Sequence, residues 1–173
     1  MRPTILLALL TAILVAACSQ DRGQVYPVPL DRVRQILSKT DLPGVFFAHT
    51  PRVEIQANKP SEVAWVVSSN GYELMRYVAT LSDTGQGRTR VALELKGAKG
   101  GEVEKCLAET SSIRNLYMVA MEEQIASAIE ERSFDLAKMG QAFTRAAPDL
   151  IKMRQALGDA IKASAHRESL KSR

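Results

Sequence analysis

Four side chains in this chain of 173 residues are the candidates for a general acid or base: His49, Tyr72, Glu73 and Tyr77. An imidazole, a carboxyl group and a phenol can exchange protons with a substrate only where they converge on one pocket. Tyr72 and Glu73 are neighbours in a predicted strand, so their side chains point to opposite faces and at most one of them can join such a site. We therefore assign no catalytic residue.

The sequence lacks the motifs of the common enzymes and metal sites. It contains no glycine-rich phosphate loop with lysine and serine, no Gly-x-Ser-x-Gly, no His-Glu-x-x-His and no Cys-x-x-Cys. Two histidines and two cysteines are a poor set of metal ligands. We predict no metal and no cofactor, and we favour a non-catalytic protein over an enzyme.

Cys18 closes an apolar or small run from Ile5 to Ala17 that follows Arg2. The run has the length of the apolar part of an export signal and is too short for a permanent membrane span. Its end, Val15-Ala16-Ala17-Cys18, resembles the lipobox of bacterial lipoproteins, in which the cysteine takes a diacylglyceryl group before the signal is cleaved. The resemblance implies lipidation of Cys18, which becomes the first mature residue. An ordinary secretory signal that contains a cysteine is the alternative.

The residue after the cysteine bears on the location of the protein. Ser19 stands where the sorting rule of bacterial lipoproteins places aspartate for retention in the inner membrane, so the resemblance favours the periplasmic face of the outer membrane, with the inner membrane as the alternative. A lipidated Cys18 leaves Cys106 without a disulfide partner in the chain. We interpret Cys106 as a buried thiol and keep a reactive site as the alternative.

Composition excludes a further class of partner. The formal net charge is +4, aromatic residues make up 5% of the chain, and lysine and arginine are spread among nearly as many acids. A nucleic-acid surface of interleaved basic and aromatic residues is therefore not predicted. The length suits one globular domain with a modest core.

Alternating apolar residues predict an antiparallel meander of four strands within Val53 to Leu95. Turns are expected at Lys59-Pro60-Ser61, at Asn70-Gly71 and at Asp83 to Gly87, and Asn-Gly is the strongest of these hairpin signals. The segment Val25 to Pro29 is expected at a sheet edge, because its two prolines cannot donate to a ladder.

Helical spacing predicts an amphipathic helix from Leu30 to Lys39 and a long helix from Ile113 that should lie on the sheet. The apolar pattern of the long helix continues toward Pro148, and its acidic pairs are expected on a solvated face (Glu122, Glu123, Glu130 and Glu131). Glu102 to Leu107 is read either as a short strand or as the approach to a helix. A last basic helix is expected from Pro148 to about His166, with an apolar stripe made of Leu150, Ile151, Leu157 and Ile161.

This order of elements resembles the helix-grip fold of the START-like superfamily, which includes polyketide cyclase and lipid-transfer domains. The resemblance is carried by Val25 to Leu37, by Ala64 to Thr80 and by Gly87 to Val91. It implies an α+β fold in which an antiparallel meander curls over a long C-terminal helix and encloses a ligand cavity. The chain departs from the family in having fewer strands and an extra helical tail beyond Phe134, and no family catalytic residue can be carried over.

The first hypothesis is therefore a lipid-anchored periplasmic protein that binds an apolar or lipid-like ligand between sheet and helix. We divide the chain into a signal peptide (1–17), a lipidated tether (18–23), a helix-grip-like domain (24–134) and a basic helical tail (135–173). Aromatic and apolar residues are the candidates for lining the cavity: Phe46, Phe47, Trp65, Tyr77, Tyr117 and Met121.

Two other functions stay open. The second is a structural or assembly accessory that docks on an envelope protein through its C-terminal helix. The third is an enzyme of the cyclase or hydratase kind, which rests on the family resemblance alone.

Overall fold

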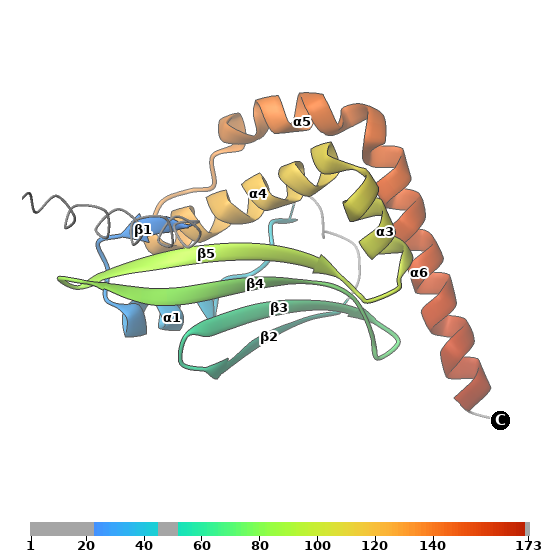
Figure 1. The fold of residues 1–173 in the computed structure, drawn as a ribbon, viewed down its shortest axis with the longest axis horizontal. Helices are drawn as coiled ribbons and strands as arrows, with labels where there is room; N and C mark the ends of the chain where they lie inside the picture. The colour runs from blue at the N-terminus through green and yellow to red at the C-terminus, as the bar shows by residue number, and fades with distance from the viewer. Residues whose placement is uncertain (1–22, 45–51, 172–173) are drawn as a thin grey trace, which may run out of the picture.

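A computed structural model describes residues 23–44 and 52–171 and places them in an α+β fold (Figure 1). Five antiparallel strands form one sheet in the order β1-β5-β4-β3-β2. The strands are β1 (Gln24–Tyr26), β2 (Arg52–Lys59), β3 (Glu62–Ser69), β4 (Tyr72–Gly85) and β5 (Arg88–Gly97). The predicted four-stranded meander is confirmed, and the segment predicted at the edge pairs with β5 as β1.

The hairpin turns follow from residues that tolerate a left-handed backbone. Asn70 and Gly71 join β3 to β4 with φ angles of 49° and 75°, as a type I′ turn requires. The turn between β4 and β5 is tighter than predicted, since the strands end at Gly85 and begin again at Arg88. The Asp83 carboxylate accepts a hydrogen bond of 2.7 Å from the Gly85 amide and helps to close this turn.

The helices lie mainly on one side of the sheet, in two layers (Figure 1). They are α1 (Leu30–Leu37), α3 (Glu102–Glu109), α4 (Ser111–Ile129), α5 (Gly140–Ala146) and α6 (Leu150–Lys171), with short 3-10 turns η1 (Leu136–Met139) and η2 (Ala147–Asp149). The long helix predicted from Ile113 is α4, and the segment at Glu102 is the helix α3. The arrangement is helix-grip-like, with α5 lying over α4 as an outer layer.

The core is formed where α4 and α1 meet the curled sheet. Trp65 on β3 pairs with Tyr77 on β4, and both side chains are fully buried. The Trp65 indole donates a hydrogen bond of 2.6 Å to the Thr40 carbonyl just beyond α1, and the Tyr77 hydroxyl donates one of 3.2 Å to the Tyr117 carbonyl on α4. Each large apolar side chain buried here stabilises the fold by about 1.5–3 kcal/mol.

Two helical predictions were wrong in detail. The pattern from Ile113 does not continue as one helix, because α4 ends at Ile129 and Glu131 adopts a left-handed φ of 52°. In α6 the predicted stripe residue Ile151 is 67% exposed, whereas Met153, Ala156 and Ser164 are buried. The small side chains of Ala156 and Ser164 permit close approach of α6 to its neighbours. These residues are therefore buried because of their size, which a hydrophobic pattern does not reveal.

Candidate functional site

A cleft of about 570 Å³ lies between β5 and α4, at the edge of the sheet where β1 pairs. Alternation along β5 directs Val91 and Leu93 toward the helix, and the i, i+4, i+7 spacing of Met118, Glu122 and Ile125 puts these three on one face of α4. The remaining lining comes from the start of the described chain, at Gly23, Gln24 and Tyr26. The volume is within the range of pockets that hold small ligands.

The cleft exists because the sheet is narrow at this edge. Further along β5, Leu95 is 1% exposed and belongs to the filled core, whereas Leu93 is only half buried. β1 contributes three residues, Gln24–Tyr26, and therefore covers little of the space beside Leu93. Met118 on α4 is also half buried, so apolar surface on both sides remains available to a ligand.

Two titratable groups line this cleft, in addition to the polar side chain of Gln24. Tyr26 is 3% exposed, and burial, followed by the nearby carboxylates of Glu130 and Glu122, raises the pKa of its phenol to about 12. The Glu122 side chain lines the cleft from an exposed position, and partial loss of water there raises the pKa of its carboxyl group. The cleft thus offers apolar walls, a neutral hydroxyl and a carboxyl group. These groups suit a ligand with an apolar body and a hydrogen-bonding head.

A smaller pocket of about 180 Å³ adjoins this cleft and shares Gln24 and Glu122 with it. Lys138 of η1 lines the same pocket. The first described residues therefore lie beside the start of the C-terminal helical segment, although more than a hundred residues separate them in sequence.

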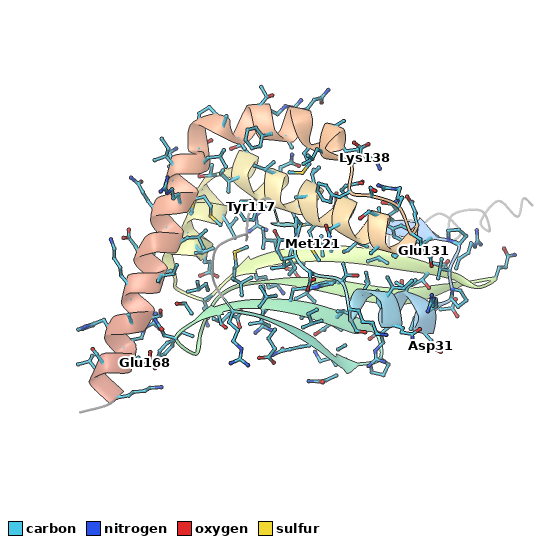
Figure 2. All side chains as sticks on the ribbon, turned by 180° about the vertical axis from the view of Figure 1, so that it is seen from behind. Asp31, Tyr117, Met121, Glu131, Lys138 and Glu168 are labelled. Atoms are coloured by element: carbon cyan, nitrogen blue, oxygen red, sulfur yellow. The ribbon has the colours of Figure 1, made fainter. Side chains whose placement is uncertain are left out.

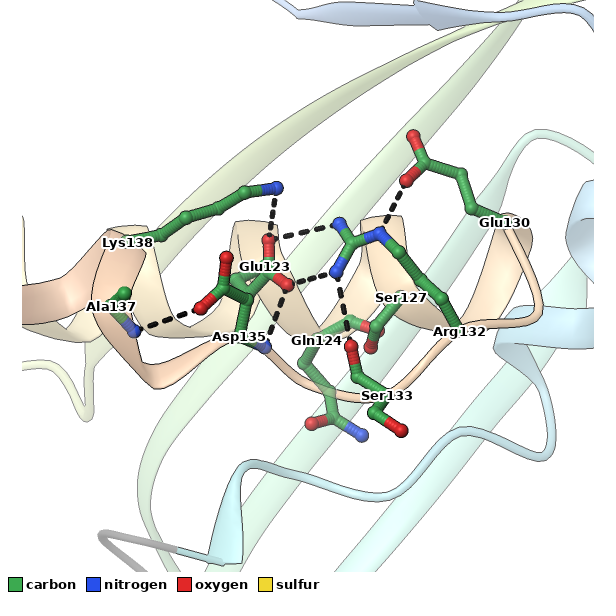
Figure 3. A network of polar contacts seen from close by, with 9 residues as sticks. All are labelled: Glu123, Gln124, Ser127, Glu130, Arg132, Ser133, Asp135, Ala137 and Lys138. Carbon is green, nitrogen blue, oxygen red and sulfur yellow. Dashed lines mark hydrogen bonds and ion pairs between the residues drawn. The ribbon is translucent and has the colours of Figure 1, made fainter.

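The connection between α4 and η1 is fixed by one buried carboxylate, Glu123 (Figure 3). Its oxygens accept hydrogen bonds from both terminal nitrogens of Arg132, from Lys138 Nζ at 2.9 Å and from the Asp135 amide at 3.0 Å. The Arg132 guanidinium also donates to Glu130 Oε2 at 2.6 Å. These contacts, led by Arg132, lower the Glu123 pKa to about 2. Both oxygens of the Glu123 carboxylate are paired with groups of the protein itself, so we interpret the network as structural.

Glu123 corrects a prediction from the sequence. The acidic pairs of the long helix were expected on a solvated face, and the Glu123 side chain is instead 3% exposed. The helical pattern gave no sign of this, because Arg132 and Lys138 reach the carboxylate only after the chain reverses beyond α4.

The cavity candidates named from the sequence fall into two groups. Phe46 and Phe47 lie outside the described residues, as do His49 and Cys18. The other four are buried in the core between sheet and helices: Trp65, Tyr77, Tyr117 and Met121. Figure 2 shows Tyr117 and Met121 on α4, over the sheet. The eight described residues that line the larger cleft include none of these four.

The described acid and base candidates have separate partners. The Glu73 carboxylate pairs with Arg76, and the Tyr77 hydroxyl is held at the Tyr117 carbonyl. The Tyr72 ring lies 4.8 Å from the Arg167 guanidinium carbon on α6. Tyr72, Glu73 and Tyr77 are therefore not brought together in one site.

The sequence contained one usable signal for the cleft that was missed. Met118, Glu122 and Ile125 have helical spacing, so Glu122 shares a face with two apolar side chains. Nothing local pointed to Tyr26, which reaches the cleft only because β1 pairs with β5.

Within residues 23–44 and 52–171, no cluster of histidine, cysteine, aspartate and glutamate has the arrangement of a metal site. No helix in the same ranges combines the length and the apolar character needed to cross a membrane. Comparison of the chain with protein-family models, with curated proteins and with solved structures gave no match.

Proposed function

We propose that the chain is a lipid-anchored protein of the periplasm whose folded part binds a small apolar or lipid-like ligand without catalysis. The observation that carries the proposal is the cleft of about 570 Å³ between β5 and α4, with Leu93 and Met118 on its walls and Tyr26 and Glu122 as its polar groups. Its position between sheet and helix agrees with the resemblance of the sequence to START-like domains. The separation of Tyr72, Glu73 and Tyr77 favours binding over acid–base catalysis.

The anchor in this proposal rests on the sequence Val15-Ala16-Ala17-Cys18. Five residues, 18–22, connect the predicted lipid to Gly23, and an extended chain of this length spans roughly 17 Å. A ligand cleft lined by Gly23 would then lie close to the membrane surface. This position suits a protein that exchanges apolar molecules with a bilayer.

The C-terminal helix is a weaker candidate for a docking element. The stripe that suggested docking is partly used within the fold, because Leu150 and Leu157 pack against the core. Ser164 of the same helix accepts a hydrogen bond of 3.1 Å from the Asn70 side chain. We therefore do not propose docking through α6 as the main function.

Filling the cleft tests ligand binding. A tryptophan at Leu93 should occupy the space beside Met118 and abolish both the uptake of a hydrophobic dye and any ligand mass retained in native mass spectrometry. Ala92→Trp is the matched control, since Ala92 neighbours Leu93 on the opposite face of β5 and pairs with Thr80. Equal dye binding by the two variants, with both folded by circular dichroism, would exclude the cleft as the site.

The anchor is tested separately by metabolic labelling with palmitate. The wild-type chain should carry the label and partition into detergent, and Cys18→Ser should do neither. Absence of label from the wild type would refute the lipid anchor while leaving ligand binding in the cleft untouched.

A further inference from the structure

The outer side of η1 and α5 carries large apolar side chains that no described element covers. Leu136 is 63% exposed and Phe143 49% exposed. They are seven residues apart, or about two helical turns, so they lie on the same side of the segment. Three other apolar residues of the segment, Met139, Ala142 and Ala146, are buried. Figure 1 shows α5 as the outermost layer, on the far side of α4 from the sheet.

The C-terminal helical part of the chain, which begins with η1 and α5 and continues through α6, holds the positive charge of the protein. Residues 136–171 contain seven lysines and arginines and three acidic residues, whereas the rest of the chain contains sixteen of each. Within η1 and α5 the basic residues are Lys138, which pairs with Glu123, and Arg145, which points to a different side of α5 from Phe143. Neither Arg145 nor Arg154 on α6 forms an ion pair with any residue in the described ranges. Exposed apolar tips flanked by unpaired basic residues are typical of helices that lie in the interface of an anionic membrane.

The place of β1, the first described strand, indicates the same partner. Gln24, at the start of β1, and Lys138, in η1, line one pocket of about 180 Å³. The start of β1 therefore lies beside η1. A lipid five residues before Gly23 would bring the bilayer to the side of the molecule on which Leu136 is exposed.

We infer that the outer side of η1 and α5, on which Leu136 and Phe143 are exposed and to which Arg145 adds a positive charge at its margin, lies on the anionic leaflet to which Cys18 attaches the protein. The inference rests on the lipid anchor in the proposed function but not on ligand binding. It gives the anchored domain a second membrane contact and hence a fixed orientation, with the outer face of the sheet directed away from the bilayer. A short lipid tether alone would leave the orientation free.

Tryptophan quenching tests the contact in the full chain. Protein purified from cell membranes is reconstituted into vesicles of phosphatidylglycerol and phosphatidylcholine with brominated acyl chains. Phe143→Trp should be quenched several-fold more strongly than Thr80→Trp, whose position is exposed on the outer face of the sheet. The native Trp65 is fully buried and contributes the same background to both variants. Adding Arg145→Glu to Phe143→Trp should reduce the quenching in anionic vesicles and not in pure phosphatidylcholine.

The outcomes separate this inference from the proposed function. If the protein floats with the vesicles and Phe143→Trp is quenched no more than Thr80→Trp, the membrane contact is refuted and the anchor stands. If the protein does not float at all, both the anchor and the contact are refuted. Neither result changes dye binding in the cleft, which Leu93→Trp measures independently.

Discussion

Glu123 is the one charged residue that is buried within the described ranges. We interpret its charge as holding the connection after α4 in place rather than as part of a reaction. A carboxylate removed from water is costly unless its oxygens are fully paired. Arg132, Lys138 and the Asp135 amide supply those partners from the connection that follows α4. The consequence is that η1 is held beside β1, where the cleft and the proposed membrane contact meet.

Replacing Glu123 with glutamine should destabilise the protein by about 2–3 kcal/mol near neutral pH, because the amide cannot pair with both cations. The folded-state pKa of about 2 lies below the ordinary value of 4.5, so the stabilisation by Glu123 is complete above about pH 4.5 and is lost as the pH falls toward 2. Between about pH 6 and pH 3, the free energy of unfolding should therefore fall by about 2 kcal/mol more for the wild type than for the variant. Urea unfolding at each pH measures this difference.

Glu130→Gln is the matched control for this measurement. Glu130 contacts the same arginine from a side chain that is 44% exposed, so its loss should cost about 1 kcal/mol or less and leave the pH profile of the wild type nearly intact. A Glu123→Gln protein with the wild-type acid profile would show that other carboxylates determine the acid sensitivity.

At the scale of elements, the sheet and α4 could be predicted because their signals are local. Asn70-Gly71 specifies a hairpin by backbone conformation alone, and the apolar spacing from Ile113 specifies one buried helix face. The cleft could not be predicted in this way. It depends on how far α4 diverges from β5 and on the shortness of β1, and its polar groups Tyr26 and Glu122 come together only in the folded chain.

The junction between β5 and α3 offers a test of packing at the scale of elements. A Cβ added at Gly97 would lie 2.3 Å from the Glu104 backbone nitrogen, so the strand and the helix approach each other as closely as glycine permits. Gly97→Ala should therefore destabilise the fold by about 2 kcal/mol or more, because backbone must move to relieve the contact.

Gly158→Ala is the matched control, since Gly158 lies inside α6 with no atom within 4 Å of the added methyl group. This change should stabilise the protein by about 0.5–1 kcal/mol through helix propensity. The melting temperature, measured by circular dichroism, should therefore fall for Gly97→Ala and rise for Gly158→Ala. A Gly97→Ala protein that melts at or above the wild-type temperature would contradict the close approach of β5 and α3.

At the scale of the whole molecule, three features gather on one side. Gln24, near the start of the described chain, and Glu122 line both the cleft and the smaller pocket beside it. Lys138 of η1 also lines the smaller pocket. The opposite side is the outer face of the sheet, where polar side chains such as Glu94 are exposed. A lipid attached at Cys18 would therefore place the cleft and α5 toward the membrane and the sheet toward the periplasm, which connects ligand exchange with orientation in one arrangement.

The short strand β1 joins these features, and its removal is the test at this scale. A shortened chain that begins at Asp21 keeps β1 and should melt cooperatively and bind hydrophobic dye in the cleft. A chain that begins at Pro27 loses Tyr26, which is 3% exposed, and leaves the β5 edge unpaired. Loss of a buried aromatic side chain costs about 3–5 kcal/mol, so this second chain should melt at a clearly lower temperature, bind less dye and tend to associate through the open edge. Equal melting temperatures and dye binding for the two chains would show that β1 is neither part of the core nor a wall of the cleft.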